Sequence, residues 1–388
     1  MKKIILFALF LFTINISAQG INFFESGEAE LKKPIEKVNL NYQYEIPLVR
    51  VNINGKNYQF LFDTGAPTVI STEIYKDFNL TEKHLSKITD SQNNKQKQIF
   101  TEIPEMKIDD IIFKNIGAVV IDLKGTEFDC LKIDGVIGAN QMALLSWRIN
   151  YSENSMEATK DLAHFSTEGY ETVFNFESKP QKTPVIKTKI LGKKIEMTFD
   201  TGFTGSLKIQ DKYYNPKKVN QKFVETYGIS SVGAFGAAKP QVSYQFKPDE
   251  ILLDQQKFKN QVIMTGISDL LGNEFLKKFK FILDWKNKKI YLNRIKSDEL
   301  TFKSFGFGHR FIDNKAKVVF LFKEKDFPLQ FDDEILSINT TRLENLDNES
   351  VCNYILNGID RDKDFLKIKV KRGDQILDFS LAKKEYLK

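Results

Sequence analysis

Apolar and polar residues alternate in short runs along most of the chain. Runs such as "VVFLF" (318–322) and "LKIKVKR" (366–372) are typical, and 33 of the 388 residues are Phe. A period of two over four to eight residues is the pattern of β-strands, whereas long amphipathic helices need a period near 3.6. The pattern therefore predicts an all-β fold.

Two strand-like runs end in the same triplet. "FLFDTGAPTVIS" (60–71) and "MTFDTGFTGSL" (197–207) each place Asp-Thr-Gly directly after an apolar stretch. A single carboxylate at the end of a buried strand is unfavourable unless it is paired or protonated. The second triplet suggests the solution, which is that Asp63 and Asp200 meet each other.

The matches around the triplets extend far enough to indicate an internal repeat. The turns "NGK" and "LGK" precede the two triplets at equal spacing, and the apolar turns "VIG" (136–138) and "LLG" (270–272) follow them at similar spacing. Repeated matches of this kind indicate two copies of one supersecondary unit. We predict a first unit at residues 40–156 and a second unit at 180–296, joined by a connection at 157–180.

With these residues the chain resembles the aspartic peptidases of the pepsin and retropepsin type, over roughly residues 40–296. The resemblance implies a bilobal acid-protease β-barrel fold, built here from two retropepsin-like units in one monomer with pseudo-two-fold symmetry. It also implies a peptide or protein substrate, no cofactor and no metal. Asp63 and Asp200 would be the catalytic residues.

The chemistry of such a pair follows from its electrostatics. Two close carboxylates cannot both ionise easily, so they hold one proton between them. The ionised carboxylate can take a proton from water, while the protonated one polarises the substrate carbonyl. We expect the other triplet residues to support this catalytic loop: Thr64, Gly65, Thr201 and Gly202. In the family, the two threonines bond across the lobes and fix the spacing of the dyad.

Other residues near the triplets have two possible roles. Ala66 and Phe203 either line the substrate-binding cleft or pack in the core. Asp134 and Asp269, just before the apolar turns, are interpreted as turn residues because acid–base work needs only the triplet pair. The β-hairpin flaps that the family uses are expected at 89–100 and 228–241, although neither segment contains the Tyr of the pepsin branch.

After the repeat, residues 300–388 form a separate C-terminal unit of strands with one short helix and a hairpin around "RGDQ". The segment "DDEILSINTTRLENL" (332–346) resembles the core of PDZ domains, which implies a C-terminal peptide as a possible ligand. "FGFG" (305–308) is either the loop that captures the peptide carboxylate or simply the first strand. Asp332 stands where PDZ domains have Gly.

The N-terminus and the composition bear on the location of the protein. Residues 1–18 have two lysines, an apolar run and a small-residue end, the layout of a signal peptide, so we expect an exported protein that is periplasmic or secreted. Removal of the signal peptide lowers the formal net charge of the chain from +6 to +4. The lysines are scattered along the chain, which argues against nucleic acid as a partner. No later segment is long enough to span a membrane. Cys130 and Cys352 lie in different units and are expected to be unpaired.

Two functions remain from the sequence. The first is an exported aspartic endopeptidase that uses Asp63 and Asp200. The alternative is a peptide-binding protein that uses the cleft and the PDZ-like unit and has weak or no hydrolysis. Both intact triplets favour the first.

Overall fold

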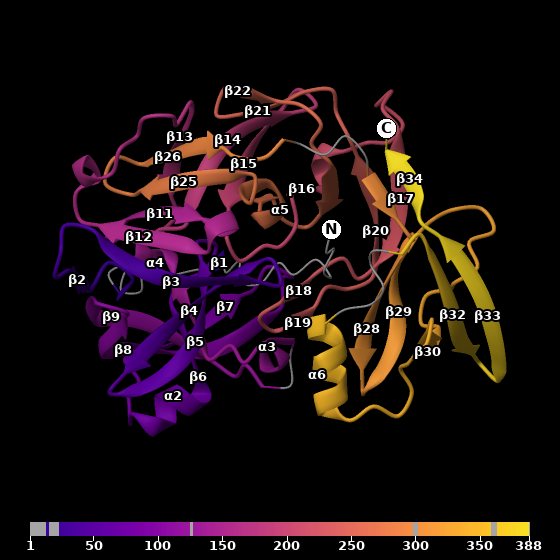
Figure 1. The fold of residues 1–388 in the computed structure, drawn as a ribbon, viewed down its shortest axis with the longest axis horizontal. Helices are drawn as coiled ribbons and strands as arrows, with labels where there is room; N and C mark the ends of the chain where they lie inside the picture. Colours follow the sequence, from indigo (N-terminus) through magenta and orange to yellow (C-terminus); the bar gives the residue numbers. More distant parts are fainter. Residues whose placement is uncertain (1–12, 15–22, 125–126, 298–301, 358–362, 388) are drawn as a thin grey trace.

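The computed structural model describes residues 13–14, 23–124, 127–297, 302–357 and 363–387, and strands dominate it (Figure 1). The all-β prediction is confirmed. Searching these residues found no helix that is long and apolar enough to cross a membrane. The predicted signal peptide lies outside the described residues, apart from the backbone of β1 (Thr13–Ile14), which pairs antiparallel with β7 (His84–Thr89).

The elements in and next to the first unit are mostly strands, with short helices after the turns. They are β2 (Glu28–Glu30), β3 (Glu36–Gln43), β4 (Ile46–Ile53), β5 (Lys56–Asp63), β6 (Val69–Ser71), α2 (Thr72–Asp77), β7, β8 (Lys95–Ile108), β9 (Ile111–Ile121), α3 (Glu127–Cys130), β10 (Gly135–Gly138), α4 (Ala139–Met142), β11 (Ser146–Asn150), η1 (Tyr151–Glu153), β12 (Ser155–Thr159) and η2 (Leu162–His164).

The second unit has a similar order of strands. Its elements are β13 (Thr172–Ser178), β14 (Pro184–Ile190), β15 (Lys193–Phe199), β16 (Leu207–Gln210), η3 (Asp211–Tyr213), β17 (Phe223–Gly228), β18 (Val232–Gly233), β19 (Gly236–Ala237), β20 (Gln241–Phe246), β21 (Ile251–Leu253), β22 (Gln256–Phe258), β23 (Ile263–Gly266), β24 (Leu270–Leu271), α5 (Asn273–Leu276), β25 (Phe279–Asp284) and β26 (Lys289–Arg294). β13 lies inside the predicted 157–180 connection and pairs with β14 and β26, so this part of the connection is a strand that joins the sheets of the second unit.

The two glycine turns that precede the triplets form tight hairpins as predicted. Asn54 and Gly55 join β4 to β5, and Leu191 and Gly192 join β14 to β15. All four residues have positive φ, between 48° and 83°. This is the geometry of a two-residue hairpin turn, which glycine adopts at little cost. Both turns deliver the chain into the strand that leads to an aspartate.

One antiparallel sheet joins the two units. Its strands follow the order β3, β12, β11, β25, β26 and β13, and the central pair joins β11 of the first unit to β25 of the second. Beneath the aspartates, the apolar core is continuous across this sheet. Phe62 and Trp147 from the first unit share it with Phe199 and Phe281 from the second. Since each buried aromatic side chain contributes about 2 kcal/mol or more, the shared core fixes the units against each other.

The C-terminal unit has the strands and the helix that the sequence predicts. They are β27 (Phe302–Ser304), β28 (Phe307–Ile312), β29 (Lys315–Phe322), β30 (Glu334–Ile338), β31 (Thr341–Arg342), α6 (Asn348–Asn357), β32 (Phe365–Arg372), β33 (Gln375–Ala382) and β34 (Lys384–Leu387). Residues 305–306 form the whole β27–β28 loop, and 307–308 begin β28. Gly373 (φ 57°) lies in the β32–β33 hairpin turn.

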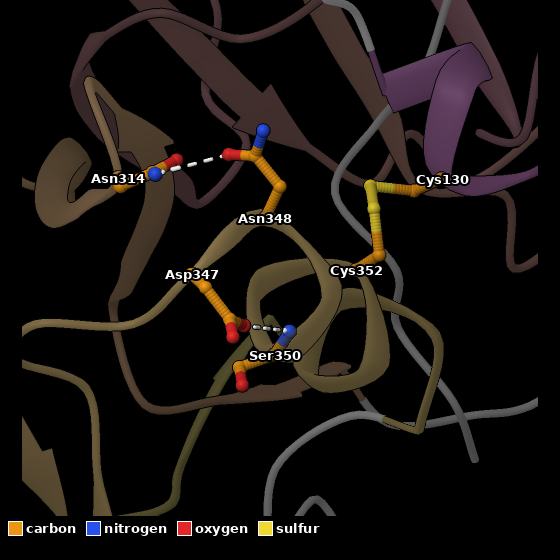
Figure 2. Close-up of a disulfide and its surroundings, with 6 residues drawn as sticks. All are labelled: Cys130, Asn314, Asp347, Asn348, Ser350 and Cys352. Atoms are coloured by element: carbon orange, nitrogen blue, oxygen red, sulfur yellow. Dashed lines mark hydrogen bonds between the residues drawn. A yellow bond between two sulfur atoms is a disulfide. The ribbon is translucent and has the colours of Figure 1, made fainter.

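This unit is attached to both halves of the molecule. β29 pairs antiparallel with β17 of the second unit, with Tyr227 opposite Leu321. A disulfide joins Cys130 of α3 to Cys352 of α6, across 222 positions of sequence (Figure 2). The prediction of unpaired cysteines is therefore wrong, because α6 packs beside α3 and brings the two thiols together. A cross-link over so long a loop reduces the entropy of the unfolded chain by an amount worth several kcal/mol in the simplest treatment.

Candidate active site

Two strands carry the aspartates to neighbouring positions. β5 ends at Asp63, and β15 ends one residue before Asp200. Each strand has a parallel neighbour from an apolar-apolar-Gly turn, since Gly138 of β10 pairs with Asp63 and Leu271 of β24 pairs with Phe199. The same local arrangement thus occurs twice, once in each unit.

The glycines of these turns have no space for a side chain. A Cβ at Gly138 would lie 2.0 Å from the carbonyl carbon of Pro67, and one at Gly272 would lie 2.4 Å from the carbonyl oxygen of Phe203. Only glycine lets the backbone pass this closely behind an Asp-Thr-Gly loop. This explains why glycine recurs after two apolar residues in both units.

The two threonines of the triplets hold the loops together across the units. Thr64 N–H donates to Thr201 Oγ1 and Thr201 N–H donates to Thr64 Oγ1, both at 3.0 Å. The hydroxyls then donate to backbone carbonyls of the opposite unit, Thr64 to Phe199 at 2.5 Å and Thr201 to Phe62 at 2.7 Å. These four reciprocal bonds are fully buried, and they fix the distance between the two aspartates.

The two glycines of the triplets each face the opposite carboxylate. A Cβ at Gly65 would lie 2.8 Å from Asp200 Cγ, and one at Gly202 would lie 2.3 Å from Asp63 Cγ. Any larger residue would push the opposite aspartate away. The structure therefore brings Asp63 and Asp200 together, with the backbone of each loop against the carboxylate of the other.

Backbone amides bind one oxygen of each carboxylate. Gly65 N–H donates to Asp63 Oδ1 at 2.7 Å, while Gly202 and Phe203 donate to Asp200 Oδ1 at 2.9 and 3.0 Å. Within the described part of the chain, Asp63 Oδ2 and Asp200 Oδ2 are buried and lack a donor group at hydrogen-bonding distance. One oxygen of each carboxylate is thus available for a proton shared by the pair.

Burial raises the pKa of both carboxyl groups. Asp63 and Asp200 are both 0% exposed. Burial, followed by the charge of Asp200, raises the pKa of Asp63 well above its usual value. Burial raises the pKa of Asp200 to about 6, against the opposing effects of the hydrogen bonds that it accepts and of the Lys179 charge. The pair therefore carries one proton near neutral pH, and each titration belongs to the pair.

Two hairpins close the region beside the dyad. The β7–β8 hairpin turns at residues 90–94, and the β17–β20 hairpin carries the smaller β18–β19 hairpin at its end. Their tips bond to each other, because Phe235 N–H donates to Asp90 Oδ2 at 2.9 Å and Ser231 Oγ donates to Gln92 Oε1 at 2.8 Å. These tips coincide with the segments expected to form flaps.

Ala66 and Phe203, the predicted cleft residues, are both fully buried in this closed arrangement. Ala66 packs in one apolar cluster with Val232 and Ala234 from the end of the second hairpin. Phe203 lies over the second glycine turn, where its carbonyl accepts from Asn273 N–H at 2.7 Å. In the structure both residues have packing roles, and their contact with a substrate stays a prediction.

Asp134 and Asp269 hold strands in place. Asp134 accepts from the Gln59 amide at 2.9 Å, and Asp269 accepts from the Gln210 amide at 2.8 Å. Burial raises the pKa of each. Neither is paired with a second carboxylate in these bonds, which agrees with a structural role. A search of the described residues found no group of three His, Cys, Asp or Glu side chains that could hold a metal ion.

Sequence reasoning missed one charged residue at the hairpins. Lys208 in β16 is 1% exposed, and its Nζ donates to Ser231 Oγ at 3.0 Å. In "SLKIQ" it stands at an alternate position between apolar residues, where a strand that faces solvent would place it outside. Its stem packs against Gly266 of β23, and its ammonium meets Ser231 of the second hairpin.

Part of the chain is similar to a known protein family. Residues 49–140 match the aspartyl protease family model. The aspartyl protease-like region includes the first triplet and the glycine turn behind it, and it indicates a peptidase function. The second triplet lies outside the match. A search of curated proteins found no match to this chain.

Proposed function

We propose that this chain is an exported aspartic endopeptidase in which Asp63 and Asp200 share one proton. The observation that carries the proposal is the reciprocal burial of two carboxylates, each against the glycine of the other triplet. A pure binding protein gains nothing from two buried acids that destabilise it at neutral pH. In a hydrolase, the same pair provides a general acid and a general base side by side.

The mechanism follows from the protonation of the pair. The ionised carboxylate takes a proton from a water molecule as the water attacks the peptide carbon, while the protonated carboxyl donates to the carbonyl oxygen. This gives a tetrahedral diol, with the water proton on the first carboxyl group and the second carboxyl group ionised. The first carboxyl group then protonates the nitrogen as the C–N bond breaks, while the second takes the proton back from the hydroxyl that it had protonated. The products are an amine and a carboxylic acid, and the pair again holds one proton. Thr64 and Thr201 keep the carboxyl groups at constant spacing throughout this cycle. The hairpins exclude bulk water once a peptide is bound.

The peptide must reach a dyad that is fully buried in the closed form. The bonds between Asp90 and Phe235 and between Gln92 and Ser231 have to break first. An extended peptide can then add to a hairpin edge, as the backbone of β1 does at β7. Hairpin opening is therefore part of the proposed cycle.

Cleavage of an unbiased peptide mixture from about pH 3 to 8 tests the proposal. The mature protein should cleave internal peptide bonds, and the Asp63→Asn variant should not. Asp134→Asn is the matched control, because its amide oxygen can still accept from Gln59; we expect it to retain cleavage. Peptide binding without cleavage by the wild-type protein at every pH would contradict the enzyme and favour the peptide-binding alternative.

The C-terminal unit suggests a second role, control of the second hairpin. β29 extends the sheet of β17, and the disulfide anchors α6 to α3 of the first unit. We propose that this PDZ-like unit binds the C-terminal end of a peptide and thereby changes the freedom of the β17–β20 hairpin. The N-terminal signal peptide and export belong to the same proposal, since an oxidising compartment would preserve the disulfide.

Hydrogen exchange tests this control directly. We expect the Cys130→Ser/Cys352→Ser variant to exchange faster at residues 223–246 than the wild-type protein, while residues 84–89 change less. Addition of a peptide with a free C-terminal carboxylate should slow exchange at 307–312, and its C-terminal amide should not. Unchanged exchange at 223–246 in the double variant would contradict the role of the C-terminal unit.

A further inference from the structure

The two units place different residues at one equivalent position of the cleft wall. Val69 of β6 pairs antiparallel with Val136 and parallel with Val119. Lys208 of β16 pairs antiparallel with Leu270 and parallel with Met264. Because the strands around them match in order and direction, Lys208 stands in the second unit where Val69 stands in the first.

The surroundings of the two residues differ as sharply as the residues do. Val69 lies in the apolar cluster that also contains Ala66, Val136 and the hairpin residues Val232 and Ala234. Lys208 instead directs its ammonium to Ser231 Oγ, which in turn donates to Gln92 of the other hairpin. One half of the cleft is therefore apolar, and the other half contains a buried cation at the point where the hairpins meet.

The buried ammonium has little compensation in the closed form. The acceptor that it bonds to, Ser231 Oγ, is neutral, and Asp211 is the acidic group whose charge acts on it. Burial lowers the pKa of Lys208 to about 8, so the group remains charged at neutral pH. A buried charge with one neutral acceptor is unfavourable, and a carboxylate would be a better partner.

In the proposed cycle, opening of the hairpins would expose this cation to the substrate. The Ser231–Gln92 bond must break for a peptide to enter, and movement of the second hairpin also withdraws Ser231 from Lys208. The ammonium then faces the cleft without its acceptor. A substrate side chain on the second-unit side of the cleft takes the place of Ser231.

We propose that Lys208 is a specificity-determining residue that selects an acidic side chain, Asp or Glu, on one side of the scissile bond. The inference rests on the proposed function, because it assigns the substrate class of the same cleft. On the opposite side, the cluster around Val69 selects an apolar side chain. The predicted substrate is thus a peptide with one acidic and one apolar anchor that flank the bond to be cut.

Matched peptides that differ only by Glu or Gln at one position test the proposal. At one substrate position, on one side of the scissile bond, the wild-type protein should prefer Glu to Gln. The kcat/KM for the Glu peptide should be about tenfold or more above that for the Gln peptide, as expected for a hydrogen bond to a charged group. The Lys208→Met variant should lose this preference, so that its kcat/KM is the same for the Glu and the Gln peptide. Lys212→Met, which removes an exposed lysine four residues away, should retain the preference.

Three results would overturn the assignment. The first is the absence of a Glu preference in the wild-type protein, and the second is a Glu preference that survives in Lys208→Met. The third is an equal change of kcat/KM for all peptides in Lys208→Met, because this would mean that Lys208 only closes the hairpins. Lys208→Gln, which retains a donor to Ser231, serves if the Met variant does not fold. Calorimetric binding of the Glu and Gln peptides to Asp63→Asn decides the question independently of turnover, so it separates this proposal from the enzymatic one.

Discussion

The two units have nearly the same arrangement of residues around the aspartates, but they differ at the cleft wall where a substrate would bind. Around Asp63 and Asp200 three features are reciprocal: the threonine bonds, the facing glycines and the glycine turns behind them. One layer farther out, Val69 in one unit corresponds to Lys208 in the other. The proton-sharing pair requires symmetry, whereas recognition of a peptide, which has a direction, does not.

The hairpins differ in the same way. In the described part of the chain, the outer edge of β7 has only the two-residue β1 beside it, while β17 is held by β29 of the C-terminal unit. The second hairpin also carries Ser231, the partner of Lys208. Under the proposed function, the second hairpin is the one that the C-terminal unit controls, through the pairing of β17 with β29. Four predictions test how similar the two units are at the aspartates and how different they are at the hairpins.

The largest effect should come from the symmetric pair. Asp63→Asn and Asp200→Asn should each lower kcat/KM by roughly 10³-fold or more, because each variant removes one partner of the acid–base pair. Rates on one good peptide measure both. A variant that retains more than a tenth of the activity would break the equivalence of the two aspartates.

The next effect should separate the hairpins. Gly228 (φ 133°) ends β17, and a Cβ there would lie 2.1 Å from Val319 O of β29, whereas Gly236 (φ 126°) has open space. Gly228→Ala should lower stability by about 2–4 kcal/mol more than Gly236→Ala, since both strain the backbone but only the first disrupts the strand pair. Urea unfolding measures the difference. Equal losses would mean that the pairing of β17 with β29 contributes little.

A smaller effect should appear at the threonine bonds. Thr64→Val and Thr201→Val should each lower the free energy of unfolding by about 1–3 kcal/mol more than Thr188→Val does. The Thr188→Val control loses a single buried hydrogen bond, to Ile195 O. Each of the first two variants leaves an amide of the other loop without its acceptor. Clearly different losses for Thr64 and Thr201 would show that the loops are not equivalent.

The smallest effect concerns stability against pH. The folded-state pKa of Asp63 is raised, so the folded protein binds more protons than the unfolded chain above about pH 4, and stability falls as the pH rises through this range. Asp63→Asn lacks this penalty. Its melting temperature should match that of the wild-type protein near pH 4 and exceed it by roughly 2–4 °C at pH 7. A constant difference at all pH values would contradict the raised pKa.

The local features of this fold were predictable because short-range chemistry determines them. The turns at Gly55 and Gly192 and the strands leading to Asp63 and Asp200 follow from patterns of fewer than a dozen residues. The glycine turns were also predictable, because the repeat gave each of them a second, independent example.

The remaining features depend on contacts between distant segments. Cys130 and Cys352 are 222 positions apart, and only the packing of α6 against α3 makes them partners. The pairing of β17 with β29 and the burial of Lys208 likewise require a hairpin from one segment to fold against another. Alternation within "SLKIQ" cannot reveal that both faces of that strand are covered.

The pH dependence of kcat/KM on a good peptide tests the central claim, that two aspartates share one proton. Because burial raises both pKa values, with Asp200 at about 6, the one-proton form dominates at a higher pH than for free aspartates. We predict a bell-shaped profile of kcat/KM with its acid limb near pH 6. In Asp63→Asn and in Asp200→Asn the activity should be lost, and the profile with it. A profile with a single limb, or one that Asp200→Asn leaves unchanged, would contradict the shared proton.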